Sequence, residues 1–301
     1  MRRNCLILFL ASPLAATTAP AQAPPSADLW RVATASLTSP PALVTGAAAT
    51  FWNPAGPLDQ AHLSVGGQMV QTADILGLAG FLIGAQRTIG RSAQVNLLVG
   101  RVHIRDLVRT TSSPNSLEGS IPVYEFSVGV GGGFHSSTIE FGGLLRLHES
   151  RFDFLGEGGV TFDLGLRVRP FDRLRVAAAT HFFPVDFSRD ETTDYYIGAE
   201  YDVGRRVSIA GTHARVVLRY GTTFHALGGV DHTVGAGMMW QEQFAVDAVL
   251  MGESALGKRM WRPALGLSLR FGRYTVVLAR SNGLNDLGAT YRIGLDVEVM
   301  R

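Results

Sequence analysis

The sequence predicts an all-β protein: a transmembrane antiparallel β-barrel of about 14 strands with an N-terminal plug. Three observations predict it. The 301 residues are 46% hydrophobic and only 17% charged, yet after the N-terminus no run approaches the roughly 18–20 consecutive apolar residues of a membrane-spanning helix. Apolar and polar residues alternate with a period of two in many segments. The connections between these segments alternate between short and long.

The first 23 residues have the pattern of a secretory signal peptide. Arg2 and Arg3 precede a short apolar stretch, and Ala21-Gln22-Ala23 offers a small-x-small cleavage site. Cleavage would remove Cys5, the only cysteine, and two of the 27 Lys and Arg residues. The remaining 25 would balance 25 Asp and Glu residues. Because no basic field is left, we expect no nucleic-acid partner.

Residues 24–61 do not alternate and are rich in Ala, Thr, Ser and Pro. Their aromatic side chains are costly to leave in water, and the Asn-Pro and Gly-Pro steps force tight, non-helical backbone. The segment is either a disordered linker or a plug folded into the lumen. The plug is favoured because it buries the aromatic residues. The predicted plug and ligand-contacting residues are Trp30, Phe51, Trp52, Asn53, Pro54, Ala55 and Gly56.

Residues 62–301 contain the alternating segments. In the last of them, Ile293, Leu295 and Val297 alternate with Gly294 and Asp296, so one face of the strand is apolar and the other is small or charged. The predicted lengths cluster near the ~9–11 residues of a tilted membrane strand. The predicted strands are 62–71, 76–86, 92–105, 122–134, 138–149, 158–169, 173–183, 194–203, 207–221, 230–240, 244–252, 263–271, 274–282 and 289–299.

The connections after even-numbered strands are tight, and those after odd-numbered strands are mostly longer. This parity is typical of barrels in the outer membrane of Gram-negative cells, where we expect the protein to reside with lipid as a partner. Closure of the barrel pairs the backbone N–H and C=O groups of the sheet edge, which lipid cannot hydrogen-bond. The alternative is a soluble sandwich or barrel with an apolar core, which alternation alone does not exclude.

The polar alternates of the strands are predicted to line the lumen, and their charges are of both signs. Such charges can pair across neighbouring strands and hold the plug, whereas an ion-selective pore would show one sign at its constriction. Alternatively, some of the arginines contact an anionic head group. The predicted lumen residues are Glu125, Glu140, Arg146, Asp163, Arg167, Arg169, Arg175, Arg270, Arg292, Asp296 and Glu298.

The stretch Phe51-Trp52-Asn53-Pro54-Ala55-Gly56 resembles the (Y/F/W)-N-P-A-(G) signature near the mature N-terminus of the FadL/TodX-type outer-membrane transport proteins. The related PorV/PorQ proteins carry a similar stretch. The resemblance implies a 14-stranded barrel with an N-terminal hatch that passes small hydrophobic ligands such as fatty acids or aromatic hydrocarbons. A PorV-like chain would instead assist type IX secretion and bind secretion-system proteins. The chain departs from the family in its short loops and in its end, Val299-Met300-Arg301.

Sequence signals for metal binding and for catalysis are weak. The eight histidines show no metal-binding spacing, so no metal or cofactor is expected. A lipid-modifying enzyme would need a nucleophile, but Gly252-Glu253-Ser254-Ala255-Leu256 falls one residue short of G-x-S-x-G and lies in a predicted loop. The nearness of His181, Asp186 and Ser188 in sequence says nothing about triad geometry. We therefore expect no enzyme activity.

Overall fold

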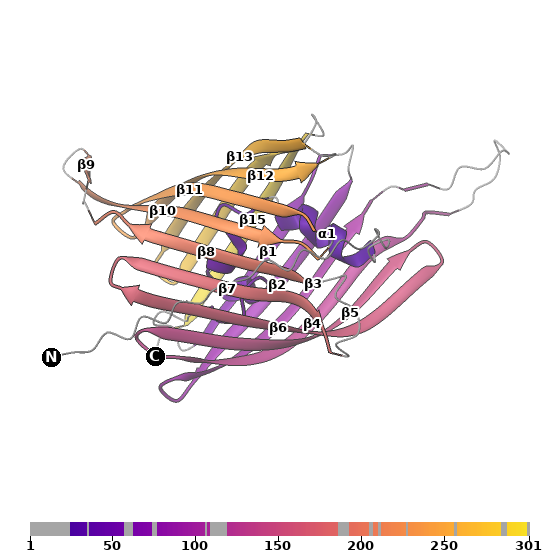
Figure 1. Cartoon of the computed structure of the whole chain (residues 1–301), viewed down its shortest axis with the longest axis horizontal. Coiled ribbons are helices and arrows are strands. Elements are labelled where there is room, and N and C mark those ends of the chain that lie inside the picture. Colours follow the sequence, from indigo (N-terminus) through magenta and orange to yellow (C-terminus); the bar gives the residue numbers. More distant parts are fainter. Residues whose placement is uncertain are drawn as a thin grey trace.

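A closed antiparallel β-barrel of 14 strands forms the body of the protein, which confirms the predicted barrel. Strands β1–β8 and β10–β15 make the barrel wall, and the short strand β9 pairs only with β10 (Figure 1). The computed structural model describes residues 25–34, 36–56, 63–73, 77–105, 107–108, 119–185, 193–204, 207–209, 212–226, 228–255, 258–283 and 288–299. The predicted signal peptide, residues 1–23, lies outside the described residues.

The elements follow one another around the barrel in chain order. The helices precede all strands and are α1 (Pro25–Thr34), η1 (Pro41–Leu43) and η2 (Ala47–Phe51). The strands are β1 (Leu63–Gln71), β2 (Leu78–Ile89), β3 (Ala93–Ile104), β4 (Val123–His135), β5 (Ile139–Phe152), β6 (Leu155–Phe171), β7 (Leu174–Pro184), β8 (Asp194–Asp202), β9 (Val207–Ile209), β10 (Thr212–Phe224), β11 (Val230–Trp240), β12 (Phe244–Ala255), β13 (Lys258–Phe271), β14 (Tyr274–Asn282) and β15 (Ala289–Val299).

The barrel closes where β1 pairs with β15, from Leu63 opposite Val299 to Gln71 opposite Tyr291. The period of two then decides which side chains face outward. In β1, Met69 is 67% exposed whereas its neighbour Gln68 is 8% exposed. The inner face is therefore polar or small, and the outer face carries large apolar side chains. Exposed members of that outer face include Phe81, Ile83, Leu97, Phe141, Leu145, Leu265 and Ile293.

The two ends of the barrel differ. The end that holds the start of β1 and the end of β15 is called the turn end, and the opposite end is called the loop end. Two of the long connections predicted at the loop end, 150–157 and 253–262, are wrong. In the first, β5 and β6 remain paired until Phe152 opposite Leu155. In the second, β12 and β13 remain paired until Ala255 opposite Lys258, so Gly252 and Glu253 lie in a strand and not in a loop.

The predicted strand 207–221 is also wrong as a single element. Residues 207–209 form β9, and the wall strand β10 runs on to Phe224. Strand β9 pairs with only the first three residues of β10, from Ile209 opposite Thr212 to Val207 opposite Ala214. Strand β8 pairs with β10 from Val217 opposite Asp202 to Phe224 opposite Tyr195. A short hairpin therefore extends beyond the wall at the turn end (Figure 1).

Residues 25–34 and 36–56, here called the N-terminal segment, lie inside the ring of strands (Figure 1). The sequence predicted non-helical backbone at the Asn-Pro and Gly-Pro steps and no helix elsewhere in the segment, whereas the segment begins with α1 and contains the two short 3-10 helices η1 and η2 before Asn53. Pro25 starts α1, in keeping with the preference of proline for the first helical turn. No helix within the described residues has the length and apolar composition needed to span a membrane.

Candidate functional site

The inner wall carries three glycine pairs on which the N-terminal segment rests. Within each pair the two glycines lie opposite each other on neighbouring strands. A Cβ atom at these positions would press against or overlap the segment, so glycine permits the close approach. The pairs, each with a segment residue above it, are Gly66 and Gly84 with Ala47, Gly142 and Gly165 with Pro54, and Gly198 and Gly221 with Pro40.

An aromatic cluster forms between the segment and the wall. The ring centroids of Trp30 and Phe51 are 4.3 Å apart, and those of Phe51 and Trp52 are 4.6 Å apart. From the wall, the ring of His181 lies 4.8 Å from that of Phe51. All four side chains are at most 3% exposed. Burying a large apolar side chain contributes about 1.5–3 kcal/mol, so this cluster holds the segment in place.

A buried ion pair lies beside the aromatic cluster. Arg146 and Asp163 are both fully buried and bond to each other. Arg146 also donates to the Phe51 carbonyl at 3.1 Å, and its guanidinium carbon lies 4.1 Å from the Phe51 ring centroid. The second oxygen of Asp163 accepts the backbone N–H of Phe182 at 2.8 Å. The pair therefore links β5 and β6 to the segment, and neither charge is left alone in the interior.

Other wall side chains bind the backbone of the segment directly. Arg292 donates to the Ser36 hydroxyl at 3.0 Å and to the Ala33 carbonyl at 2.5 Å. Arg167 donates to the Val44 carbonyl, and Asp296 accepts the Ala47 N–H at 3.2 Å. Three neutral wall side chains donate to the carbonyls of Pro54 or Gly56, namely Gln86, Gln94 and Asn96.

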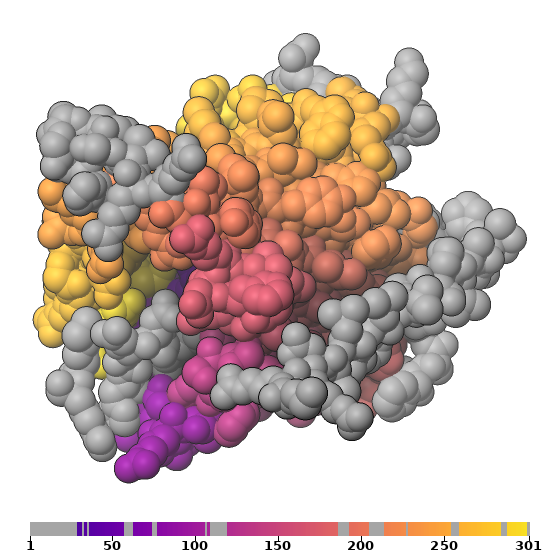
Figure 2. All heavy atoms as spheres, turned by 60° about the vertical axis from the view of Figure 1, so that its left-hand side comes forward, coloured from indigo at the N-terminus to yellow at the C-terminus, as the bar shows by residue number. Residues whose placement is uncertain are grey.

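A cavity of about 430 Å³ opens toward the turn end. Figure 2 shows the hollow between the yellow C-terminal strands and the red strands, with indigo atoms of the segment inside it. Strands β10–β15 supply much of its lining, together with segment residues 36–39 and 43–46. Several of its charges are paired: Arg219 bonds to Glu200 at 2.7 Å and also to Asp247. Apolar side chains line it as well, including Leu43, Val44, Val217, Met238, Met239 and Phe244.

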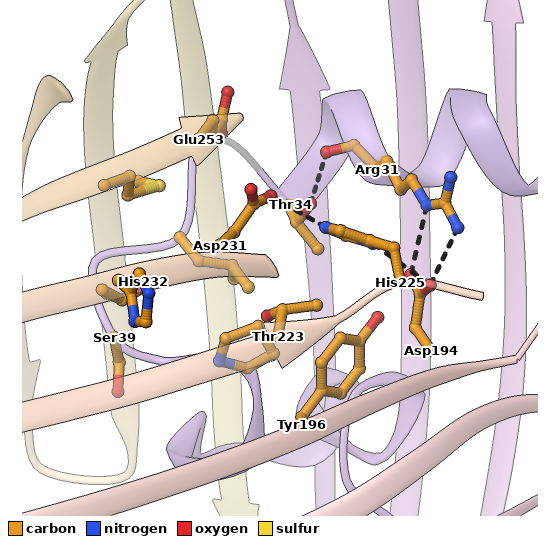
Figure 3. Close-up of a pocket in the computed structure, with 14 residues that line it drawn as sticks. Arg31, Thr34, Ser39, Asp194, Tyr196, Thr223, His225, Asp231, His232 and Glu253 are labelled. Carbon is orange, nitrogen blue, oxygen red and sulfur yellow. Dashed lines mark hydrogen bonds and ion pairs between the residues drawn. The ribbon is translucent and has the colours of Figure 1, made fainter. Parts of the chain in front are cut away.

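A smaller cavity of about 40 Å³ lies toward the loop end. Beside it, Arg31 of α1 binds Asp194 through two nitrogens, at 2.8 and 3.2 Å. His225 lies between two carboxylates, 3.1 Å from Asp194 and 2.8 Å from Asp231 (Figure 3). This network anchors α1 to β8, β10 and β11. In the part of the chain that is described, no group of three or more His, Cys, Asp or Glu side chains is arranged to hold a metal ion.

The loop-end network predicts a pH response centred on His225, which follows the end of β10. Burial opposes its charge, but the hydrogen bonds with Asp194 and Asp231 outweigh burial and raise its pKa from 6.5 to about 9. A raised pKa means that the charged imidazole stabilises the fold fully below pH 6.5, and that this contribution is lost as the pH rises through about 9. We expect an NMR titration of His225 in detergent micelles to show a midpoint near 9, with Asp231→Asn lowering it. A midpoint near 6.5 in the unsubstituted protein would contradict the network.

The predicted plug residues lie together: Trp30 and residues 51–56 are buried against the inner wall. Of the predicted lumen residues, Arg146, Arg167, Arg292 and Asp296 contact the segment directly. Asp163 pairs with Arg146, and Glu125 is buried on β4. Toward the turn end, Arg175, Arg270 and Glu298 line the larger cavity, Glu140 is half-buried, and Arg169 is exposed.

Sequence reasoning missed several residues of the interior. Arg219 and Asp247 occupy inward positions of β10 and β12, so the alternation itself could have found them. Arg31 could not be found in this way because it lies on an unpredicted helix. His181, weighed only as part of a triad, is buried beside Asp163 with 3.6 Å between its Nδ1 and the carboxylate. Asp186 and Ser188 lie outside the described residues.

Fold and interior together define a closed antiparallel barrel with the described residues of the N-terminal segment packed against its inner wall. No family model matches the chain, and no curated protein matches it. Among solved structures it is similar to Omp33 of Acinetobacter baumannii, with 9% identity, a TM-score of 0.48 and coverage of 79% of this chain and 98% of that one. A triple mutant of the Rhodopseudomonas blastica porin gives 10% identity and a TM-score of 0.44 over 78% and 99% of the two chains. The KdgM porin in complex with disordered oligogalacturonate gives 10% and 0.39 over 78% and 98%. At these TM-scores the similarities carry no functional argument.

Proposed function

We propose that this chain is an outer-membrane barrel for the passive transport of small solutes, and that residues 24–61 act as its plug. The outer face supports the membrane assignment, because large apolar side chains such as Leu145 and Ile293 stand exposed at outward positions around the barrel. A soluble barrel would place its apolar side chains inside and its charges outside. Here arginines and carboxylates are buried within the lumen. This is the arrangement expected of a barrel whose outer face contacts lipid, because its polar side chains then point inward.

The observation that carries the transport proposal is the pair of cavities on either side of the segment, one toward each end of the lumen. The lining of the larger one suits solutes with an apolar part, because Leu43, Met238 and Phe244 line it together with ion-paired arginines. This favours the fatty-acid-like or aromatic ligands that the resemblance to FadL-type proteins implies. The alternative role in type IX secretion stays a prediction that no contact of the described residues favours.

Uptake into lipid vesicles tests the proposal. Glucose and phenyl glucoside are matched probes, since they share a sugar and differ by one apolar ring. We expect the full-length protein to admit both, phenyl glucoside faster, and a variant without residues 24–61 to admit both faster still. Circular dichroism of the truncated variant checks that its barrel is intact. Uptake equal to that of protein-free vesicles for both proteins would reject transport, whereas equal rates for the two probes would reject only the preference for apolar solutes.

A further inference from the structure

Between its anchors the N-terminal segment has one stretch, residues 37–41, here called the strap, that touches the wall without bonding to it. Just before the strap, Arg292 binds Ser36 and Ala33. Just after it, Arg167 binds Val44. Across the described residues, no hydrogen bond joins the strap to a barrel strand. The strap is therefore fixed at both ends, and packing alone holds it against the wall.

The strap crosses the lumen to the wall formed by β10–β13. A Cβ atom added at Gly266 of β13 would lie 3.0 Å from the Cβ of Thr38, and one added at Gly221 of β10 would overlap the ring of Pro40. The side chain of Pro40 is buried, while Thr38 and Ser39 are partly exposed. These van der Waals contacts bring the segment against the wall at this level.

The two cavities meet the strap from opposite sides. Leu37 and Ser39 line both the loop-end cavity of about 40 Å³ and the turn-end cavity of about 430 Å³. Both cavities also run along the same wall: Thr223 of β10 and Met251 of β12 line the first, and Arg219 of β10 and Asp247 of β12 line the second. The strap is thus a thin partition between two spaces on one side of the lumen.

The other side of the lumen offers no such partition. There the segment is joined to β2, β3, β5 and β6 through the aromatic cluster, the ion pair of Arg146 with Asp163, and the side-chain bonds to Pro54 and Gly56. Opening a path there would expose buried charges and aromatic rings, which is energetically unfavourable. Between the strap and the wall, movement of the strap would break only packing contacts.

We infer that solutes pass the segment along the β10–β13 wall and that the strap, residues 37–41, is the constriction of this route. The inference rests on the proposed transport function and assigns it a path. Widening the lumen at the strap leaves the anchors at Arg292 and Arg167 in place, so the rest of the segment stays docked while solute moves past Thr38 and Pro40.

A reversible lock tests the inference in the full-length protein. Cys5, the only cysteine of the sequence, is replaced by serine, so Thr38→Cys with Gly266→Cys introduces a single pair. Their Cβ separation of 3.0 Å is close to the roughly 3.5–4.5 Å of a disulfide, and a small shift of the strap accommodates the bond. We expect oxidation to reduce uptake of glucose and phenyl glucoside to the level of protein-free vesicles, and reduction by dithiothreitol to restore it.

The matched control is Met69→Cys with Ile293→Cys, an opposed pair on the outer face of β1 and β15. Its oxidation should leave uptake unchanged. A second variant, Thr38→Ala with Pro40→Ala, needs no disulfide and is expected to raise uptake because it removes the side-chain atoms beyond Cβ that lie near Gly266 and Gly221. Unchanged uptake in the oxidised lock, shown by mass spectrometry to be bonded, or in the alanine variant, would overturn the inference. If neither the unsubstituted protein nor the variant without residues 24–61 admits solute, the transport function itself has failed.

Discussion

Replacing Arg146 by leucine should lower the free energy of unfolding by about 3–5 kcal/mol, because the carboxylate of Asp163 would be left buried without its partner charge. Both side chains are fully buried, and Arg146 also holds the Phe51 carbonyl at 3.1 Å. The measurement is denaturant unfolding in detergent micelles, followed by intrinsic fluorescence. Since the pair joins two wall strands and the segment, we also expect the segment to detach before the barrel unfolds.

Two comparisons separate this effect from a general loss of charge. Arg270→Leu removes an arginine paired with Glu298 at 2.6 Å, but these side chains are 40% and 30% exposed, so we expect a loss of only about 0–1 kcal/mol. Combining Arg146→Leu with Asp163→Asn removes both charges and keeps an acceptor for the Phe182 N–H, so much of the lost stability should return. An equal loss for Arg146→Leu and Arg270→Leu would contradict the assigned role of the buried pair.

The substitution Gly84→Val is expected to displace the N-terminal segment from the wall. A Cβ at Gly84 would overlap the backbone of Ala47 and Ala48, and backbone cannot yield as a flexible side chain can. Arg31 is the only Lys or Arg between residues 24 and 61, so trypsin cleavage after Arg31 reports the displacement directly. We expect rapid cleavage in the variant and slow cleavage in the unsubstituted protein, with faster solute uptake in the same variant.

Gly67→Val is the matched control for this substitution. Gly67 lies on the neighbouring strand β1 and lies opposite Ile83, whose side chain is 45% exposed on the outer face. A Cβ at Gly67 would approach Ile83 only to 4.0 Å, an ordinary contact. Trypsin should therefore cleave this variant as slowly as the unsubstituted protein. Rapid cleavage of both variants would show that strand stability, and not the fit of the segment, controls access to Arg31.

The barrel could be predicted because alternation is a local property. Met69 beside Gln68, or Ile293 beside Arg292, indicates one apolar face and one polar face without reference to any other strand. The extents of the hairpins at 150–157 and 253–262 could not be predicted, because polar and glycine residues there continue the pairing to Phe152 and Ala255. Pairing with a neighbour decides where a strand ends, and composition does not reveal it.

By itself, then, the sequence determined the period of the strands, their approximate number and the presence of an aromatic segment before them. The position at which that segment packs on the inner wall was decided only by the tertiary structure. Gly142 and Gly165 lie 23 positions apart in the chain, yet strand register places them opposite each other beneath Pro54. The hydrogen-bonded pair of Arg31 and Asp194 likewise joins residues that are 163 positions apart. Such contacts depend on register and closure, which are fixed by the whole ring of strands at once and not by any one stretch of residues.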